Sequence, residues 1–284
     1  MEGMLYVSTG TMVSRHNGYD YKRAVREIFK LKEKGLCDDL ELMMLVFFYD
    51  KIDDVVKTIL GAGFSPDVVH CEKEIGTMLS DGGKLFYDNK KDESDVIFKE
   101  SLRLFKLNCE TAGKLGAGRM VLHLWGGITS DKYVDYNISK LSFLEEIAGS
   151  FGVRLLIENV PSNTNDPLSN WKKLLPNLSN GGLIFDTRFG KLHEQIEDVL
   201  TDTSVNKKIE HIHISDFRGG YRDFSALRPI YHPREGKIDF KKVSALLSAI
   251  NYHGSITLES PIMTEDKLDI QKIEKTLNYI KETF

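Results

Sequence analysis

The strongest constraint in the sequence is a pattern of short apolar runs that alternate with longer amphipathic segments along the whole chain. The apolar runs predict strands at 5–9, 39–45, 67–72, 119–125, 153–160, 182–188, 209–217 and 255–260. The amphipathic segments predict helices at 21–35, 51–63, within 95–115, and at 136–149, 169–176, 194–200, 239–250 and 270–284. Strands that alternate with helices are typical of a parallel sheet.

Eight strand–helix units in a chain of 284 residues favour a closed (β/α)₈ TIM barrel that forms a single domain over residues 1–284. Several of the predicted helices end at glycine, at Gly35, Gly63 and Gly152. The alternative is an open doubly wound sheet. It is disfavoured because the segment after the first strand, STGTMVSRHNG, lacks the Gly-x-Gly-x-x-Gly turn of a dinucleotide site.

Composition excludes several classes of protein. The content is 41% hydrophobic and 28% charged, and the formal net charge of −4 makes nucleic acid an unlikely partner. Three cysteines without CxxC spacing fit a reducing cytoplasm. The N-terminus does not resemble a signal peptide, and the longest apolar run, LELMMLVFFY, is too short for a bilayer. We therefore expect a soluble cytoplasmic protein without membrane contact.

Acidic and imidazole side chains stand at the ends of the last four predicted strands. Glu158, Asp186, His213 and Glu259 each follow an apolar residue that would face the outer helices, so all four should point into the mouth of the barrel. Buried together, three carboxylates would repel one another unless a positive charge lay between them. The pattern predicts a divalent cation held by these four residues, with Mn²⁺, Mg²⁺, Co²⁺ or Zn²⁺ as its identity.

Two further interpretations concern the neighbours of this cluster. A buried ion-pair network, in which Arg154, Arg188 or Arg218 neutralises the acids, is the alternative to a metal. His70 and His123 end the third and fourth strands, where they would bind substrate oxygens or hold a second metal. Glu41 in the second strand could also face the mouth.

Several motifs resemble those of one family. The segments that carry the resemblance are VHCE (69–72), LHLWGG (122–127), LIENVP (156–161), FDTR (185–188), HIHISDF (211–217), HPREGKIDF (232–240) and TLESP (257–261). In this order they resemble the xylose isomerase-like TIM barrels, a group that includes sugar phosphate isomerases and epimerases, inosose and 3-dehydroshikimate dehydratases, and endonuclease IV-type apurinic endonucleases.

The resemblance places the family's shared metal ligands on Glu158, Asp186, His213 and Glu259. His211, two residues before the matching histidine, is then expected in the core or behind the ligands. His70 and His123 match ligands of the endonuclease group, so a binuclear centre stays open.

The chain departs from the family pattern at three places. Phe189 stands where members often carry a histidine, three residues after the strand-six aspartate. The segment after strand seven has no Asp-x-His motif before REGKIDF, which makes a three-metal phosphodiesterase unlikely. Arg234 replaces the first glycine of the family's Gly-x-Gly-x-Ile-Asp-Phe pattern. The simpler interpretation of Asp239, apart from this pattern, is that it begins the next helix.

The expected reaction is isomerisation or epimerisation of a sugar, sugar phosphate or polyol-derived keto compound. A cation that polarises the carbonyl acidifies the neighbouring C–H and stabilises the enediolate. Glu158 and Glu259, on opposite sides of the mouth, would be the catalytic pair that removes and returns the proton. The rivals are a dehydratase of the same family, an endonuclease IV-like phosphodiesterase and a barrel that binds sugar without catalysis.

Cationic side chains in the loops supply the expected contacts with substrate. Arg188, Arg218 and His232 could bind substrate hydroxyl, carboxylate or phosphate groups, as could Arg222 and Arg234. The partner is thus a small molecule derived from a sugar or polyol, and a homo-oligomer is possible.

Overall fold

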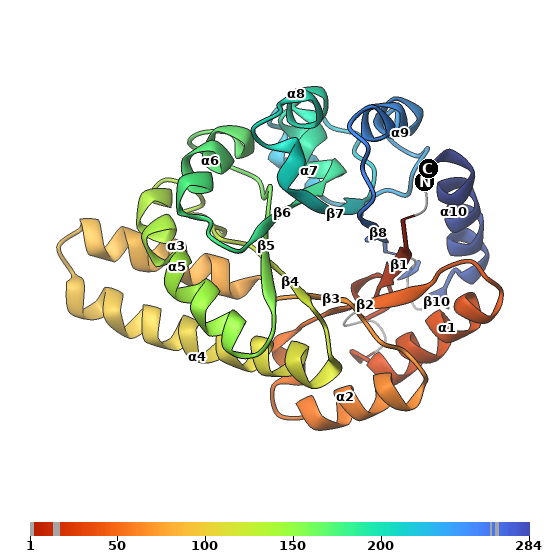
Figure 1. Ribbon diagram of the computed structural model, residues 1–284, viewed down its shortest axis with the longest axis horizontal. Helices are drawn as coiled ribbons and strands as arrows, with labels where there is room; N and C mark the ends of the chain where they lie inside the picture. Colours follow the sequence, from red (N-terminus) through yellow and green to blue (C-terminus); the bar gives the residue numbers. More distant parts are fainter. Residues whose placement is uncertain (1–2, 14–17, 262, 265–266) are drawn as a thin grey trace.

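The computed structural model describes residues 3–13, 18–261, 263–264 and 267–284. Eight parallel strands close into a barrel, because each strand pairs with the next and β8 pairs with β1 (Figure 1). The predicted (β/α)₈ barrel is confirmed. Its strands are β1 (Leu5–Ser8), β2 (Asp39–Met43), β3 (Val68–His70), β4 (Arg119–Leu122), β5 (Arg154–Glu158), β6 (Gly182–Asp186), β7 (Ile209–Ile214) and β8 (Ser255–Leu258).

Helices surround this barrel, and α3 and α4 extend beyond it as a long hairpin at the left of Figure 1. A short antiparallel pair, β9 (Met263–Thr264) and β10 (Lys267–Leu268), lies between β8 and the last helix. No helix in the described part of the chain is long and apolar enough to cross a bilayer. The helices are α1 (Tyr21–Glu33), α2 (Ile52–Gly61), α3 (Glu74–Tyr87), α4 (Lys91–Leu115), α5 (Val134–Ser150), α6 (Pro167–Leu174), α7 (Thr187–Leu192), α8 (Ile196–Thr201), α9 (Phe240–Ala249) and α10 (Ile270–Thr283).

Two helices differ from the sequence prediction. α3 was not predicted, because Gly76, Gly82 and Gly83 interrupt its apolar pattern. Gly76 is needed for packing, since a Cβ there would lie 2.5 Å from the carbonyl oxygen of His123. α7 was also not predicted. The strand expected over 182–188 ends at Asp186, whose side chain caps α7 by accepting a hydrogen bond from the Phe189 amide at 2.9 Å.

The interior of the barrel is divided into an apolar floor and a polar mouth. The floor is a separate apolar cluster formed by Tyr6, Val68, Val121, Leu156 and Ile184. Four of these residues are followed, two positions later, by His70, His123, Glu158 and Asp186. Because residues i and i+2 of a strand share a face, the polar group lies directly above the apolar floor. The larger core lies between the strands and the helices.

The loop after β5, residues 159–166, forms part of the barrel mouth and is held by its neighbours. The buried Asp131 carboxylate accepts hydrogen bonds from the amides of Asn163, Thr164 and Asn165 at 2.7–2.8 Å. It also accepts one from the Asn170 side chain at 3.0 Å. Burial alone would raise the pKa of Asp131, but these donors hold the pKa below its usual value.

Replacing Asp131 with asparagine should destabilise the protein. The amide would turn an N–H₂ group toward backbone N–H donors, so buried donors would lose their acceptor. We expect Asp131→Asn to lower the free energy of unfolding by roughly 2 kcal/mol, measured by urea denaturation. Asp135→Asn is the control, because the Asp135 side chain is 70% exposed and its loss should cost less than about 0.5 kcal/mol. Equal stabilities of the two variants would contradict the assigned role.

Candidate metal and active site

The carboxyl ends of the last four strands carry the four predicted side chains. Asp186 at the end of β6 pairs with His213 on β7, and His213 pairs with Thr257 on β8. Glu158 ends β5, and Glu259 follows directly after β8. Glu158, Asp186 and His213 have no exposed surface, and Glu259 is 7% exposed.

These four side chains converge on one point. Glu158, Asp186, His213 and Glu259 each offer a ligand atom, and the four atoms lie within 4.8 Å of one another. His213 occupies the centre, with its Nδ1 3.2 Å from Glu158 Oε1 and 3.5 Å from Glu259 Oε1. The structure therefore brings together all four residues for which the sequence predicts a shared cation.

Several buried atoms at this point make no hydrogen bond, although buried polar atoms are normally satisfied. Three of these atoms are oxygens of the converging acids and two are nitrogens of the histidines beside Glu158, and such oxygen and nitrogen atoms are the ligands that divalent cations accept. The cluster thus fits a divalent metal ion. The atoms are His70 Nε2, His123 Nε2, Glu158 Oε2, Asp186 Oδ2 and Glu259 Oε1.

The electrostatics of the protein groups in this cluster are those of crowded acids balanced by imidazoles. Burial raises the pKa of Asp186 to about 6, against the lowering effect of Arg188 and with the help of Glu158 and Glu259. Burial would also raise the pKa of Glu158, but His123 overcomes it and holds the pKa well below its usual range. For His213, burial would lower the pKa, yet the charge of Glu259, among others, raises it well above 6.5.

The second pair of predicted residues lies beside Glu158. Glu158 Oε2 forms an ion-pair contact with His123 Nε2 and lies 3.5 Å from His70 Nε2. His70 Nδ1 lies 2.7 Å from the carbonyl oxygen of Cys71. Since a carbonyl only accepts, His70 Nδ1 carries a hydrogen and donates it to this oxygen. Burial lowers the pKa of His123 to about 4, against the raising effect of Glu158.

Glu41 lies beneath the cluster and is the residue whose involvement the sequence left open. It reaches from β2 across the barrel to β7 and has no exposed surface. Its carboxylate contacts both His211 and His213 at hydrogen-bond distance. Burial would raise the pKa of Glu41, but His213 and His211 overcome this effect and hold the pKa well below its usual range.

Arginine does not neutralise the cluster in the way that an ion-pair network requires. Arg154 pairs instead with Glu210 at 2.6 Å, and Arg218 Nε donates to the carbonyl oxygen of Glu235. Within the described residues, no Lys or Arg nitrogen lies within 4.0 Å of a carboxylate oxygen of the three acids.

The residues expected to bind substrate have contacts of their own. Arg188 is 6% exposed and donates to the carbonyl oxygen of Leu227 at 3.1 Å, while its Nε makes no hydrogen bond. His232 is buried, and its two ring nitrogens contact Thr276 Oγ1 and the Pro261 carbonyl, each at 2.9 Å. The charge of Arg188 lowers the pKa of Asp186, whereas His232 is held by the surrounding fold.

The departures from the family pattern have a structural basis. Arg234 adopts φ = +78°, a left-handed conformation that favours glycine and explains why glycine would suit this position. Asp239 caps α9 by accepting a hydrogen bond from the Lys242 amide, as its simpler interpretation predicts. Phe189 packs under the Arg188 guanidinium, 4.6 Å from the ring centroid.

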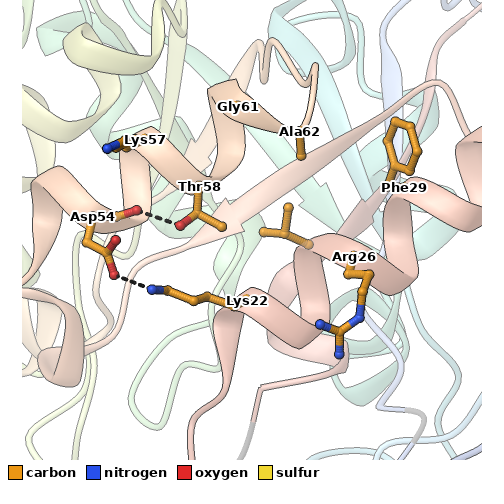
Figure 2. A pocket seen from close by; sticks show the side chains of 9 residues that line it. Lys22, Arg26, Phe29, Asp54, Lys57, Thr58, Gly61 and Ala62 are labelled. Carbon is orange, nitrogen blue, oxygen red and sulfur yellow. Dashed lines mark hydrogen bonds and ion pairs between the residues drawn. The ribbon is translucent and has the colours of Figure 1, made fainter.

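A hollow of about 610 Å³ lies away from this cluster, between α1 and α2 on the outer ring of helices. Figure 2 shows Lys22 on one helix reaching toward Asp54 on the other, while Arg26 points away from Asp54. Lys22 pairs with Asp54 at 2.9 Å, and the Asp54 side chain is half exposed. The charged groups of this lining are exposed to solvent, so the chemistry of the protein is better sought in the buried cluster.

Comparison with known families gives a clear match. A family model described as a xylose isomerase-like TIM barrel matches residues 84–283. Uncharacterized protein MJ1614 from Methanocaldococcus jannaschii is 30% identical over 196 residues, which cover 66% of this chain and 73% of that protein.

Solved structures share the fold over almost the whole chain. The 3-keto-D-glucoside 4-epimerase YcjR from E. coli superposes with a TM-score of 0.68 at 17% identity and 99% coverage of both chains. D-psicose 3-epimerase from Clostridium cellulolyticum H10, solved with D-tagatose, gives 0.69 at 14% identity, again with 99% of both chains covered. The IOLI protein, solved with a zinc atom, gives 0.70 at 18% identity and the same coverage. At these identities the likeness shows the fold.

A divalent cation should stabilise the chelator-treated protein. Only the folded chain gathers the buried ligand atoms, so an ion at one hundred times its dissociation constant should add about 2.7 kcal/mol and raise the unfolding temperature. The measurement is thermal unfolding with Mn²⁺, Mg²⁺, Co²⁺ or Zn²⁺ added after chelation. Asp186→Asn should reduce the shift strongly, whereas Asp135→Asn should retain it. Failure of all four ions to shift the wild-type transition would contradict a metal site.

Proposed function

Because the chain belongs to the xylose isomerase-like TIM barrel family, we propose that it is a divalent-metal-dependent isomerase or epimerase of a sugar, sugar phosphate or polyol-derived keto compound. The observation that carries this proposal is the convergence of Glu158, Asp186, His213 and Glu259, with unpaired buried oxygens directed at one volume. The solved epimerases that share the fold make this class of reaction the first to test.

Glu158, Asp186, His213 and Glu259 would hold the cation, which is Mn²⁺, Mg²⁺, Co²⁺ or Zn²⁺. Three carboxylates and one imidazole form a set suited to these ions. When bound, the cation would supply Lewis-acid polarisation of a substrate carbonyl, which acidifies the adjacent C–H bond.

Glu158 and Glu259 would be the acid–base pair. They come from β5 and from the end of β8, and each has a carboxylate oxygen within 3.5 Å of His213 Nδ1. A carboxylate that binds a cation through one oxygen retains the other for proton transfer. If one of the two glutamates removes the proton and the other returns it from the opposite side, the configuration of the carbon inverts.

His70 and His123 would bind substrate oxygens or a second cation. Their Nε2 atoms lie beside Glu158 Oε2, so the three side chains together offer ligand atoms for a substrate oxygen or a second cation. His123, which is 8% exposed, is the more accessible of the pair to a ligand. Arg188 is the side chain best placed to add positive charge, because it acts on the pKa of Asp186.

The reaction is tested by proton exchange. The metal-loaded protein is incubated in D₂O with a panel of ketoses, ketose phosphates, inososes and 3-dehydroshikimate, and the products are followed by NMR. We expect deuterium at the carbon beside the carbonyl of one substrate, together with its epimer or isomer. A new alkene absorbance would instead identify a dehydratase, and absence of exchange across the panel would contradict the proposal.

The roles of the two glutamates are tested with conservative variants. Glu158→Gln and Glu259→Gln should each lower turnover by about 10²–10⁴-fold, and metal content must be measured for both because each residue is also a ligand. Glu145→Gln is the control. Glu145 is a buried carboxylate that accepts amide hydrogen bonds from residues 179–181, remote from the cluster. Activity of either active-site variant equal to that of the control would rule out the assigned role.

A further inference from the structure

A column of polar side chains crosses the apolar floor of the barrel and ends under His213. Arg119 Nη2 lies 3.0 Å from Ser255 Oγ, and Ser255 Oγ lies 2.7 Å from His211 Nδ1. His211 Nε2 lies 2.9 Å from Glu41 Oε2. Barrel interiors are normally filled by apolar layers, so a continuous polar column at this place calls for a reason.

The direction of each hydrogen bond in the column follows from its first member. A guanidinium can only donate, so Ser255 Oγ accepts from Arg119 and its own hydrogen is free for His211 Nδ1. The remaining proton of neutral His211 then sits on Nε2 and is donated to Glu41. Thr257 Oγ1 also donates to Glu41 Oε2, at 2.7 Å.

Glu41 also determines the direction of the hydrogen bond that it makes with His213. The two carboxylate oxygens of Glu41 lie 3.1 and 3.2 Å from His213 Nε2. An ionised carboxylate only accepts, so the hydrogen of this nitrogen points down into the column. Nδ1 is therefore the nitrogen that faces Glu158 and Glu259.

We propose that Glu41 is a positioning residue for the cation site, which rests on the function proposed above. By holding the Nε2–H of His213, Glu41 fixes the orientation of the ring and directs Nδ1 at the other three ligands. Hydrogen-bond partners behind a histidine ligand typically contribute 10–100-fold to metal affinity. This role explains why the Glu41 carboxylate is buried beneath the mouth of the barrel and does not reach its open side.

The decisive variant is Glu41→Gln, which keeps the shape of the side chain. A glutamine carbonyl can accept from one imidazole, but its N–H₂ group then opposes the N–H of the other imidazole or the hydroxyl of Thr257. We expect the variant to bind Co²⁺ or Zn²⁺ 10–100-fold more weakly by calorimetric titration. The visible absorption bands of the Co²⁺-loaded protein should also shift, because the imidazole ligand is reoriented.

Two further variants distinguish an effect on the position of His213 from a general loss of stability. Glu145→Gln removes a different buried carboxylate and should lower the unfolding temperature of the ion-free protein while leaving Co²⁺ affinity and absorption bands unchanged. Thr257→Val leaves Glu41 in place but removes one of its donors, and it should weaken Co²⁺ binding less, in the same direction. It serves as the test if Glu41→Gln does not fold.

The outcomes distinguish this inference from the proposed function. If wild type binds the ion and Glu41→Gln binds it within twofold with unchanged bands, the positioning role is overturned and the metal site stands. If Glu41→Gln does not fold, the positioning role is also overturned when Thr257→Val shows the Co²⁺ affinity and absorption bands of the wild type. If wild type binds no ion, the proposed function itself fails and the positioning role fails with it.

Discussion

Closure of the sheet brings acidic and imidazole side chains from distant parts of the chain into one buried site at the mouth of the barrel. Because the strands are parallel, their carboxyl ends meet at one end of the barrel, and the last inward residue of each strand cannot avoid the others. Carboxylates placed there are stable only with positive charge between them, and imidazoles supply part of it. The raised pKa of Asp186 and the lowered pKa of Glu158 show that the imidazoles balance the two carboxylates unequally.

The loop after β5, which forms part of the barrel mouth, is held by hydrogen bonds from neighbouring loops. Asp131 holds the loop after β5 through consecutive backbone amides, and Arg222 donates to the carbonyl oxygens of Ser162 and Asn163 in the same loop. These holding residues come from the loops after β4 and β7. The loop that follows Glu158 is thus hydrogen-bonded to its neighbours on both sides.

The sequence predicts those parts of the structure that depend on local periodicity. The alternation of apolar runs and the spacing of residues such as Glu158 and His213 were enough to predict the barrel and the four residues that meet at its mouth. α3 was hidden because its glycines, Gly76 among them, serve close packing and weaken the helical pattern. The contact between Glu41 and His211 joins residues 170 positions apart and exists only because the barrel closes. Nor could the sequence reveal that both ring nitrogens of His232 are engaged by Thr276 and Pro261.

Arg119 connects the end of the barrel opposite the mouth with the polar column inside it. Its guanidinium reaches the carbonyl oxygen of Glu210, the carboxylate of Asp67 and the hydroxyl of Ser255 at once. A lysine ammonium has no planar fork with which to span three acceptors in this way. A substitution of Arg119, on the rim opposite the mouth, would thus remove the donor to Ser255 and alter the hydrogen bond between Ser255 and the imidazole of His211 above it.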